Sequence, residues 1–168
     1  MEGIFEVYLA GRIAGLNFDD ATRERAEITE RLEKIGVKSR NPMRGKSWLA
    51  AKIKDQPITI DTYRKQLSVQ EIIVRDLHDI DRVNVVLVLT GDSPSWGTTG
   101  EFWYATWIAH KPTLVISKNN VGGWLEYYAT KIVPDVEAAI EVLEDWKKYW
   151  DDGECVYEVI KDDKSRIN

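Results

Sequence analysis

The chain has very few of the residues from which metal and disulfide sites are built. Cys155 is the only cysteine among 168 residues, which excludes an internal disulfide and any metal site made of cysteines. His78 and His110 are the only histidines, and neither has a ligand-like neighbour at metal spacing. A metal enzyme is therefore disfavoured, and we expect neither a metal nor another cofactor.

Long apolar runs are also lacking. No hydrophobic stretch approaches the roughly 20 residues that cross a bilayer. The beginning of the chain, MEGIFEVYLAG, does not have the basic and then apolar segments of a signal peptide. We therefore expect a cytoplasmic location and no membrane partner.

The sequence has no overall excess of positive charge. Its net charge of −5 argues against a nucleic-acid partner. One local basic stretch could meet a phosphorylated substrate, although a solvated loop is the commoner explanation of such a run. Its members are Lys38, Arg40, Arg44, Lys46, Lys52 and Lys54.

Length and composition are those of one ordinary globular domain. Hydrophobic residues make up 43% of the chain and charged residues 30%, and the length is sufficient to bury a substantial core. We find no internal repeat and no low-complexity segment. The prediction is a single domain over residues 1–168, of which 160–168 form a polar tail.

The stretch from Val83 to Ser117 has the pattern of a βαβ unit. Val83 to Leu89 is an almost unbroken run of aliphatic residues, typical of a strand buried on both faces of a parallel sheet. A turn rich in Ser, Pro and Gly follows, and a helix is predicted from Glu101 onward. Lys111-Pro112 ends this helix before a strand at Thr113 to Ile116.

Similar elements are predicted on both sides of this unit. Residues 4–10 indicate a first strand, a helix capped by Asp19 or Asp20 runs to about Ile35, and residues 37–40 form a short strand. Alternating strands and helices predict an α/β fold, a doubly wound, mainly parallel sheet with helices on both faces, of the flavodoxin-like or Rossmann-like kind. The remaining expectations are a loop over 43–62 with one helical turn at 48–52, a helix over 63–80 with the buried stripe Val69, Ile73, Leu77 and Ile80, a loop over 118–128, a helix over 136–150 and a last strand over 155–160.

Several polar residues are expected at the carboxyl edge of this sheet, where open α/β folds bind ligands. Tyr8, Gly11 and Arg12 lie at the end of the first strand. The turn after the central strand comes to the same edge, and its backbone N–H groups together with the helix dipole could bind an anion. The residues of this turn are Ser95, Gly97, Thr98, Thr99 and Gly100.

Two carboxylates are candidates for catalysis. Glu101 is expected in the first helical turn, where the dipole stabilises its ionised form and keeps it available as a base or nucleophile; alternatively it only caps its own helix. Asp76 is expected near the carboxyl end of its helix, where the dipole would raise its pKa toward that of a useful acid. The alternative for Asp76 is a surface salt bridge to Arg75 or a lysine.

Tryptophan is unusually frequent, with seven in the chain. Trp48 and Trp96 are expected in loops, where an aromatic face could stack on a planar ligand. The other candidates occur in pairs at helical spacing, and we interpret them as core and subunit-interface residues. They are Trp103, Trp107, Trp146 and Trp150.

Four segments together resemble one known family. They are YLAG on the first strand, RDLHDIDRVNVVLVLT, SPSWGTTGEFWYA and KPTLVIS, which span Tyr8 to Ser117. The combination resembles the nucleoside 2-deoxyribosyltransferases and their relatives that hydrolyse deoxynucleoside monophosphates to a free base and deoxyribose phosphate.

This resemblance implies a fold and a set of roles. The residue matching Glu101 is the nucleophile that attacks the anomeric carbon, the one matching Asp76 handles the proton of the departing base, and the one matching Tyr8 positions the nucleophile. The implied fold is a five-stranded, mainly parallel sheet with helices on both faces. Family members usually form homo-oligomers in which a neighbour completes the site.

The sequence departs from the transferase pattern six residues before the nucleophile. Transferases commonly carry an aspartate there that binds the sugar hydroxyl, whereas this chain has Ser95, as the monophosphate-hydrolysing relatives do for the 5′-phosphate. Asp92 could substitute for the missing acid. The residues expected to bind substrate are Gly11, Arg12, Asp92, Ser95, Gly97 and Thr98.

The sequence therefore predicts an enzyme that cleaves the N-glycosidic bond of 2′-deoxynucleosides. A covalent deoxyribosyl intermediate on Glu101 would transfer the sugar to another nucleobase, as a retaining glycosidase transfers its sugar to water. The first alternative is hydrolysis of 2′-deoxynucleoside 5′-monophosphates. The second is a nucleotide-binding sensor without catalytic activity.

Overall fold

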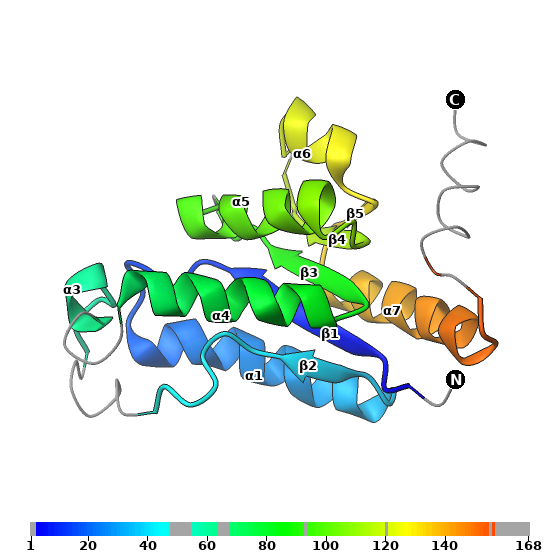
Figure 1. The fold of residues 1–168 in the computed structure, drawn as a ribbon, viewed down its shortest axis with the longest axis horizontal. Coiled ribbons are helices and arrows are strands. Elements are labelled where there is room, and N and C mark those ends of the chain that lie inside the picture. Colours follow the sequence, from blue (N-terminus) through cyan, green and yellow to red (C-terminus); the bar gives the residue numbers. More distant parts are fainter. Residues whose placement is uncertain are drawn as a thin grey trace.

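A parallel sheet forms the centre of the computed structural model, which describes residues 3–47, 55–63, 68–92, 94–119, 121–154 and 156. Within these residues the sheet has five strands in the order β2-β1-β3-β4-β5, and every neighbouring pair is parallel (Figure 1). The predicted α/β fold is thus confirmed. The strands are β1 (Glu6–Gly11), β2 (Lys38–Arg40), β3 (Val85–Leu89), β4 (Thr113–Ile116) and β5 (Lys131–Val133).

Helices cover both faces of the sheet because side chains alternate along each strand. Val7 and Leu9 of β1 join the core under α1 and α7, whereas Tyr8 and Ala10 join the core under the helices of the other face. The described helices are α1 (Phe18–Lys34), α3 (Ile60–Tyr63), α4 (Val69–Arg82), α5 (Trp96–Trp103), the π-helical segment η1 (Tyr104–Ile108), α6 (Gly123–Tyr128) and α7 (Val136–Asp151). None of them has the length and apolar character of a membrane span.

The prediction for the central unit is confirmed. All five residues of β3 are buried, as expected of a strand flanked by two others and covered on both faces. The helix that follows starts earlier than predicted, at Trp96, because the Ser95 side chain accepts a hydrogen bond from the Thr98 backbone N–H and caps it.

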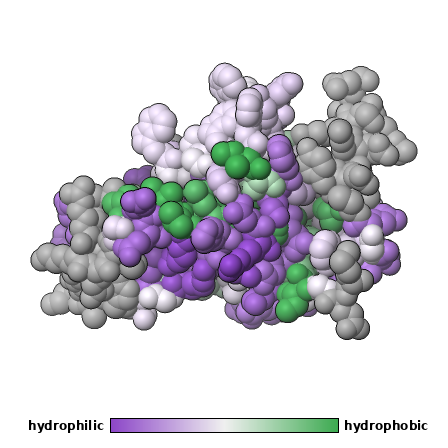
Figure 2. All heavy atoms as spheres, in the orientation of Figure 1, coloured by the Kyte–Doolittle hydropathy of each residue, from purple (hydrophilic) through white to green (hydrophobic). Residues whose placement is uncertain are grey.

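The predicted start of α4 is wrong, and its predicted buried stripe is correct at Ile80 and Leu77 but wrong at Ile73. The helix begins at Val69 because Ser68 and Glu71 form a reciprocal capping box. Ile73 is 51% exposed, whereas Asp76 and Asp79 are buried. Hydrophobic residues gather over α4 on the surface in Figure 2, in an otherwise mainly hydrophilic view. The helix therefore turns a face containing acids toward the sheet.

Asp79 explains part of this orientation. Its carboxylate contacts Arg40 of β2 at 3.4 Å and Arg44 at 2.5 Å, and Arg40 also contacts Glu6 of β1 at 2.6 Å. This network ties α4 to the edge of the sheet. A buried acid whose charge is paired can replace an apolar residue in the stripe, which a count of hydrophobic spacing does not detect.

Two further expectations are corrected, and the structure adds a strand that was not predicted. The cap of α1 is Asn17, whose side chain accepts from the Asp20 N–H, rather than Asp19 or Asp20. The stretch 118–128, predicted as a loop, contains α6. The fifth strand is Lys131–Val133. The strand predicted over 155–160 lies, except for Val156, outside the described residues, as does the helical turn predicted at 48–52.

Candidate functional site

Tyr8 and Glu101 meet on the face of the sheet that α4 and α5 cover. Tyr8 lies in β1 with no solvent exposure, and its hydroxyl donates a hydrogen bond of 2.6 Å to Glu101 Oε1. Burial, and then the negative charges of Glu101 and Asp76, raise the pKa of Tyr8 well above its ordinary value, so the phenol stays protonated. It is a fixed donor to the carboxylate.

The electrostatic expectation for Glu101 is wrong. Glu101 is the sixth of the eight residues of α5 and so lies beyond the first turn. The helix dipole acts most strongly within that first turn, and therefore only weakly on Glu101. Burial instead raises the pKa of its carboxyl group from 4.5 to about 7, and Asp76 adds to the rise. The Tyr8 hydrogen bond, Arg25 and Lys46 act in the opposite direction. The side chain thus exchanges a proton near neutrality, which suits a nucleophile or a general base.

Asp76 shares this site but not in the predicted position. It is the eighth of the fourteen residues of α4, so it lies in the middle of the helix rather than near its carboxyl end. Arg75 contacts its Oδ1 through Nε at 3.2 Å and Nη2 at 2.8 Å. The alternative of a salt bridge to Arg75 is correct, but the aspartate is buried rather than on the surface. Its charge acts on both Tyr8 and Glu101.

Cations surround these acids, and the sequence interpretation missed two of them. Arg25 is 2% exposed and donates to the Ala21 carbonyl at 2.7 Å and to the Arg12 carbonyl at 3.3 Å. Its position on the buried face of α1 follows from its spacing to Ala21, Ile28 and Leu32, which is a signal that was available. Lys46 is also 2% exposed, although it belongs to the stretch interpreted as a solvated loop.

Gly11 and Arg12 lie at the carboxyl end of β1 as predicted. A Cβ atom on Gly11 would lie 2.8 Å from Nη2 of Arg25 and 3.1 Å from Cβ of Leu89, so a side chain here would force the Arg25 guanidinium to shift. Arg12 is exposed, and its Nε donates to the Ala14 carbonyl at 3.0 Å. The structure therefore shows Gly11 packed closely against Arg25, and leaves Arg12 accessible at the carboxyl edge of the sheet.

The predicted anion-binding turn is mostly helical. Trp96 to Gly100 belong to α5, and the Ser95 hydroxyl is 2.9 Å from Thr98 Oγ1 in addition to capping the helix. Thr98 is buried, whereas Gly97 is exposed. Asp92 is exposed in the turn before the helix. These residues are arranged around a helix N-terminus rather than along a loop that wraps a ligand.

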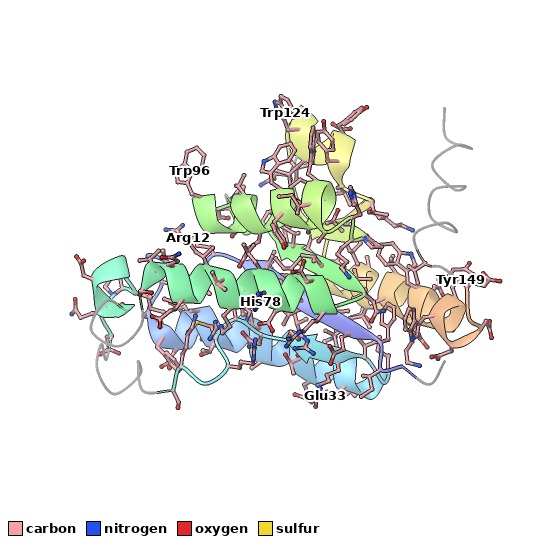
Figure 3. The ribbon with its side chains drawn as sticks, viewed as in Figure 1. Arg12, Glu33, His78, Trp96, Trp124 and Tyr149 are labelled. Atoms are coloured by element: carbon pink, nitrogen blue, oxygen red, sulfur yellow. The ribbon has the colours of Figure 1, made fainter. Side chains whose placement is uncertain are left out.

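The tryptophans have different surroundings. Trp146 is buried in the core, and Trp103 packs edge-on against Tyr128 with 5.0 Å between ring centroids. Trp107 is 58% exposed and is thus available for a subunit contact. Trp96 is 93% exposed and projects from the start of α5 in Figure 3. Trp48 lies outside the described residues.

A cavity of about 280 Å³ between α5 and α6 is lined by Thr99, Phe102, Trp103, Trp124 and Leu125.

The described residues contain no group of three or more His, Cys, Asp or Glu side chains placed to hold a metal ion. The chemistry that these residues offer is that of a carboxylate with a near-neutral pKa, a second carboxylate and a fixed phenol donor. Such a set can perform nucleophilic attack and proton transfer.

Replacing Tyr8 with phenylalanine is expected to raise the pH at which Glu101 ionises. The hydrogen bond from Tyr8 lowers the pKa of Glu101, so its loss should move the titration midpoint upward by about one unit, the order expected for a bond to a charged group. Carboxyl ¹³C NMR titration of the free protein measures this directly. Tyr149→Phe on α7, a partly exposed tyrosine, is the control. A midpoint unchanged in Tyr8→Phe contradicts the assigned bond.

The fold of the chain is similar to that of a solved enzyme and of a second solved protein. A 2-deoxyribosyltransferase from the psychrotolerant bacterium Bacillus psychrosaccharolyticus superimposes with a TM-score of 0.54, at 16% sequence identity, over 80% of this chain and 90% of that one. A conserved protein from Enterococcus faecalis V583 does so with a TM-score of 0.58, at 15% identity, over 83% and 96%. No protein-family model and no curated protein matches the sequence. The resemblance stated from the sequence is thus confirmed at the level of the fold.

Proposed function

We propose that this protein cleaves the N-glycosidic bond of 2′-deoxynucleosides and transfers the deoxyribosyl group to another nucleobase. The observation that carries the proposal is the hydrogen bond between Tyr8 and Glu101, which lie far apart in the sequence, together with the buried Asp76, whose charge acts on both. The similarity of the fold to a 2-deoxyribosyltransferase supports it. The substrates are a deoxynucleoside and a free base, and the expected assembly remains a homo-oligomer.

In the first step the ionised Glu101 attacks the anomeric carbon of the sugar. A bond forms between C1′ and a Glu101 oxygen while the bond from C1′ to the base nitrogen breaks, and its electron pair leaves with the base. Positive charge develops on the sugar in the transition state, so an adjacent carboxylate stabilises it before trapping it. Tyr8 holds one oxygen of Glu101 through its 2.6 Å hydrogen bond and so orients the other oxygen.

Asp76 acts as the general acid for the departing base and as the general base for the incoming one. As its bond to C1′ breaks, the departing base accepts a proton from the carboxylic acid form of Asp76, which becomes a carboxylate. When the nitrogen of the incoming base attacks C1′ and displaces Glu101, that base gives its proton back to the Asp76 carboxylate. Arg75 contacts Oδ1 of Asp76 through Nε and Nη2, so we assign proton transfer to Oδ2. The guanidinium also fixes the orientation of the carboxylate, as a catalytic group requires.

The test is to incubate the purified protein with a deoxynucleoside and a foreign base. Appearance of the new deoxynucleoside supports transfer, and appearance of free deoxyribose with base supports hydrolysis. If neither product forms with any deoxynucleoside or its monophosphate, the protein is not a glycosidic-bond enzyme. The third possibility, a nucleotide-binding sensor, then remains, although a carboxyl group with a pKa of about 7 in such a site favours catalysis.

The hydrolysis of 5′-monophosphates is the second candidate, and Ser95 favours it. Ser95 lies at the N-terminus of α5, and Arg12 is exposed at the end of β1. Together they could bind a phosphate, and charge-assisted hydrogen bonds contribute about 1.5–3 kcal/mol each. Asp92, exposed in the same turn, would instead repel a phosphate and accept from a free 5′-hydroxyl.

We expect free deoxynucleosides to be the better substrates because of Asp92. The measurement is kcat/KM for deoxycytidine or deoxyadenosine and for the matching monophosphate. A preference of about tenfold or more for the monophosphate, about 1.4 kcal/mol in transition-state binding, reverses the assignment. Asp92→Asn should narrow a preference for the nucleoside, whereas Asp61→Asn, an exposed aspartate of α3, should not.

A further inference from the structure

Lys46 differs from the rest of the basic stretch in which it occurs. The side chains of Lys38 and Arg44 are 59% and 43% exposed, and each pairs with an acid at the edge of the sheet. Lys46 is 2% exposed. Burying an ammonium group costs free energy unless charges around it compensate, so this position calls for an electrostatic explanation.

The loop that carries Lys46 is fixed to the helix that carries Asp76. Nη2 of Arg75 donates to the Pro42 carbonyl at 2.7 Å and to Asp76 Oδ1 at 2.8 Å, so one guanidinium joins the two segments. The loop then turns through Gly45, whose φ is +71°, and the Lys46 N–H donates to the Met43 carbonyl at 3.2 Å. This loop thus buries Lys46 where the charges of Asp76 and Glu101 both act on it.

Among the described residues, the charged and titratable groups that act on Lys46 and Glu101 come from three further elements. They are Asp76 and Arg75 of α4, Arg25 of α1 and Tyr8 of β1. Burial, Arg75 and Arg25 lower the pKa of Lys46 to about 8, against the opposite effect of Asp76 and Glu101. Lys46 in turn lowers the pKa of Glu101, against the effects of burial and Asp76.

We propose that Lys46 is a positioning residue of this site, a buried cation that holds Glu101 in the ionised form that attacks the sugar. Without positive charge beside them, two buried carboxylates favour a state in which one of them is protonated and unable to attack. What the ionised Glu101 does rests on the proposed function; that Lys46 keeps it ionised does not.

Lys46 differs from the two arginines in a way that matters for regulation by pH. A guanidinium stays charged at any pH at which the protein is folded, whereas a lysine can lose its proton. As the pH rises, Glu101 ionises near pH 7, and Lys46 loses its charge near pH 8. The state with both groups charged is therefore favoured between these values.

The test compares Glu101 ionisation in four variants of the whole protein. Lys46→Met and Lys46→Gln remove the charge, Lys46→Arg keeps it, and Lys34→Met removes an exposed lysine of α1 as the matched control. Carboxyl ¹³C NMR follows the titration, and the Glu101 signal is assigned by its loss in Glu101→Gln. Either neutral variant that retains the native circular dichroism spectrum is sufficient.

The midpoint of Glu101 is expected to rise by about one unit in the neutral variants and to stay unchanged in Lys46→Arg and Lys34→Met. The activity of the neutral variants should then be about tenfold below that of the parent on the acid side of neutrality. The difference in activity between these variants and the parent should shrink as the pH rises past the point at which Lys46 of the parent loses its charge. A midpoint unchanged in the neutral variants overturns the proposal, as does an equal loss of activity at every pH. If the midpoint moves but no glycosidic bond is ever cleaved, only the proposed function fails.

Discussion

Replacement of Glu101 by glutamine is expected to abolish base release and exchange, with a loss of at least about four orders of magnitude in kcat. Glutamine has nearly the same shape, and its amide oxygen can still accept the bond from Tyr8 that Glu101 accepts now at 2.6 Å. It cannot form the covalent ester with C1′ or carry the negative charge that stabilises the transition state. Single-turnover assays of base release measure the loss.

The same substitution should make the protein more stable at alkaline pH. The pKa of Glu101 is about 7 in the folded protein against an ordinary 4.5, so the folded state holds the proton more tightly than the unfolded state. The free energy of unfolding therefore falls as the pH rises from about 4.5 to about 7, by an amount on the order of 3 kcal/mol. Glutamine has no such cost.

Urea unfolding at two pH values distinguishes this effect. We expect Glu101→Gln to exceed the parent in stability near pH 8 and to match it near pH 4.5, where the parent carboxyl is protonated in the folded state. Glu141→Gln, an exposed position on α7, is the matched control for both activity and stability. If Glu101→Gln keeps turnover near that of the parent, the covalent mechanism is wrong.

The gain in stability has a general explanation. A carboxylate that is buried beside a second carboxylate lowers the stability of the folded state. The folded state tolerates this cost because the rest of the fold is stable enough to offset it. The parallel strands β1 and β3 supply this rigidity, since every residue in both is buried. Tyr8, which holds Glu101 through its hydroxyl, lies on one of these buried strands.

The sequence was sufficient for the elements whose pattern reflects burial. An aliphatic run surrounded on both faces has one structural interpretation, and β3 lies where the pattern of Val83 to Leu89 placed it. The family resemblance then identified Tyr8, Asp76 and Glu101, which the structure brings together. Spacing along the sequence could not show this meeting, because it depends on how β1, α4 and α5 pack in space.

Local properties of the site were not predictable for the same reason. The dipole argument for Glu101 depended on its place in the helix, and the cap at Ser95 moves the start of α5 five residues upstream of Glu101. Whether Lys46 is solvated depends on a loop that Arg75 holds from another helix. The stripe of α4 failed at Ile73 because paired acids, Asp76 and Asp79, occupy the buried face.

Asp76→Asn is expected to reduce kcat by about 10²–10⁴, the usual contribution of proton transfer by a positioned side chain. Asparagine keeps the size of the residue but cannot exchange a proton. It also loses the charge that pairs with Arg75 at 2.8 Å, so a change in rate alone would not separate catalysis from structure. The dependence on the leaving group does separate them.

A base that is stable as an anion needs little help from a proton, whereas a poor leaving group depends on it. For Asp76→Asn the loss should therefore be large with an ordinary deoxynucleoside and small with one whose base is substituted to be more acidic. Asp81→Asn, on the exposed face of the same helix and bonded to Tyr104 at 3.0 Å, is the control and should behave as the parent with both substrates. An equal loss with both substrates would assign Asp76 to holding Arg75 and the Lys46 loop in place, and the proton would then have to pass through another group.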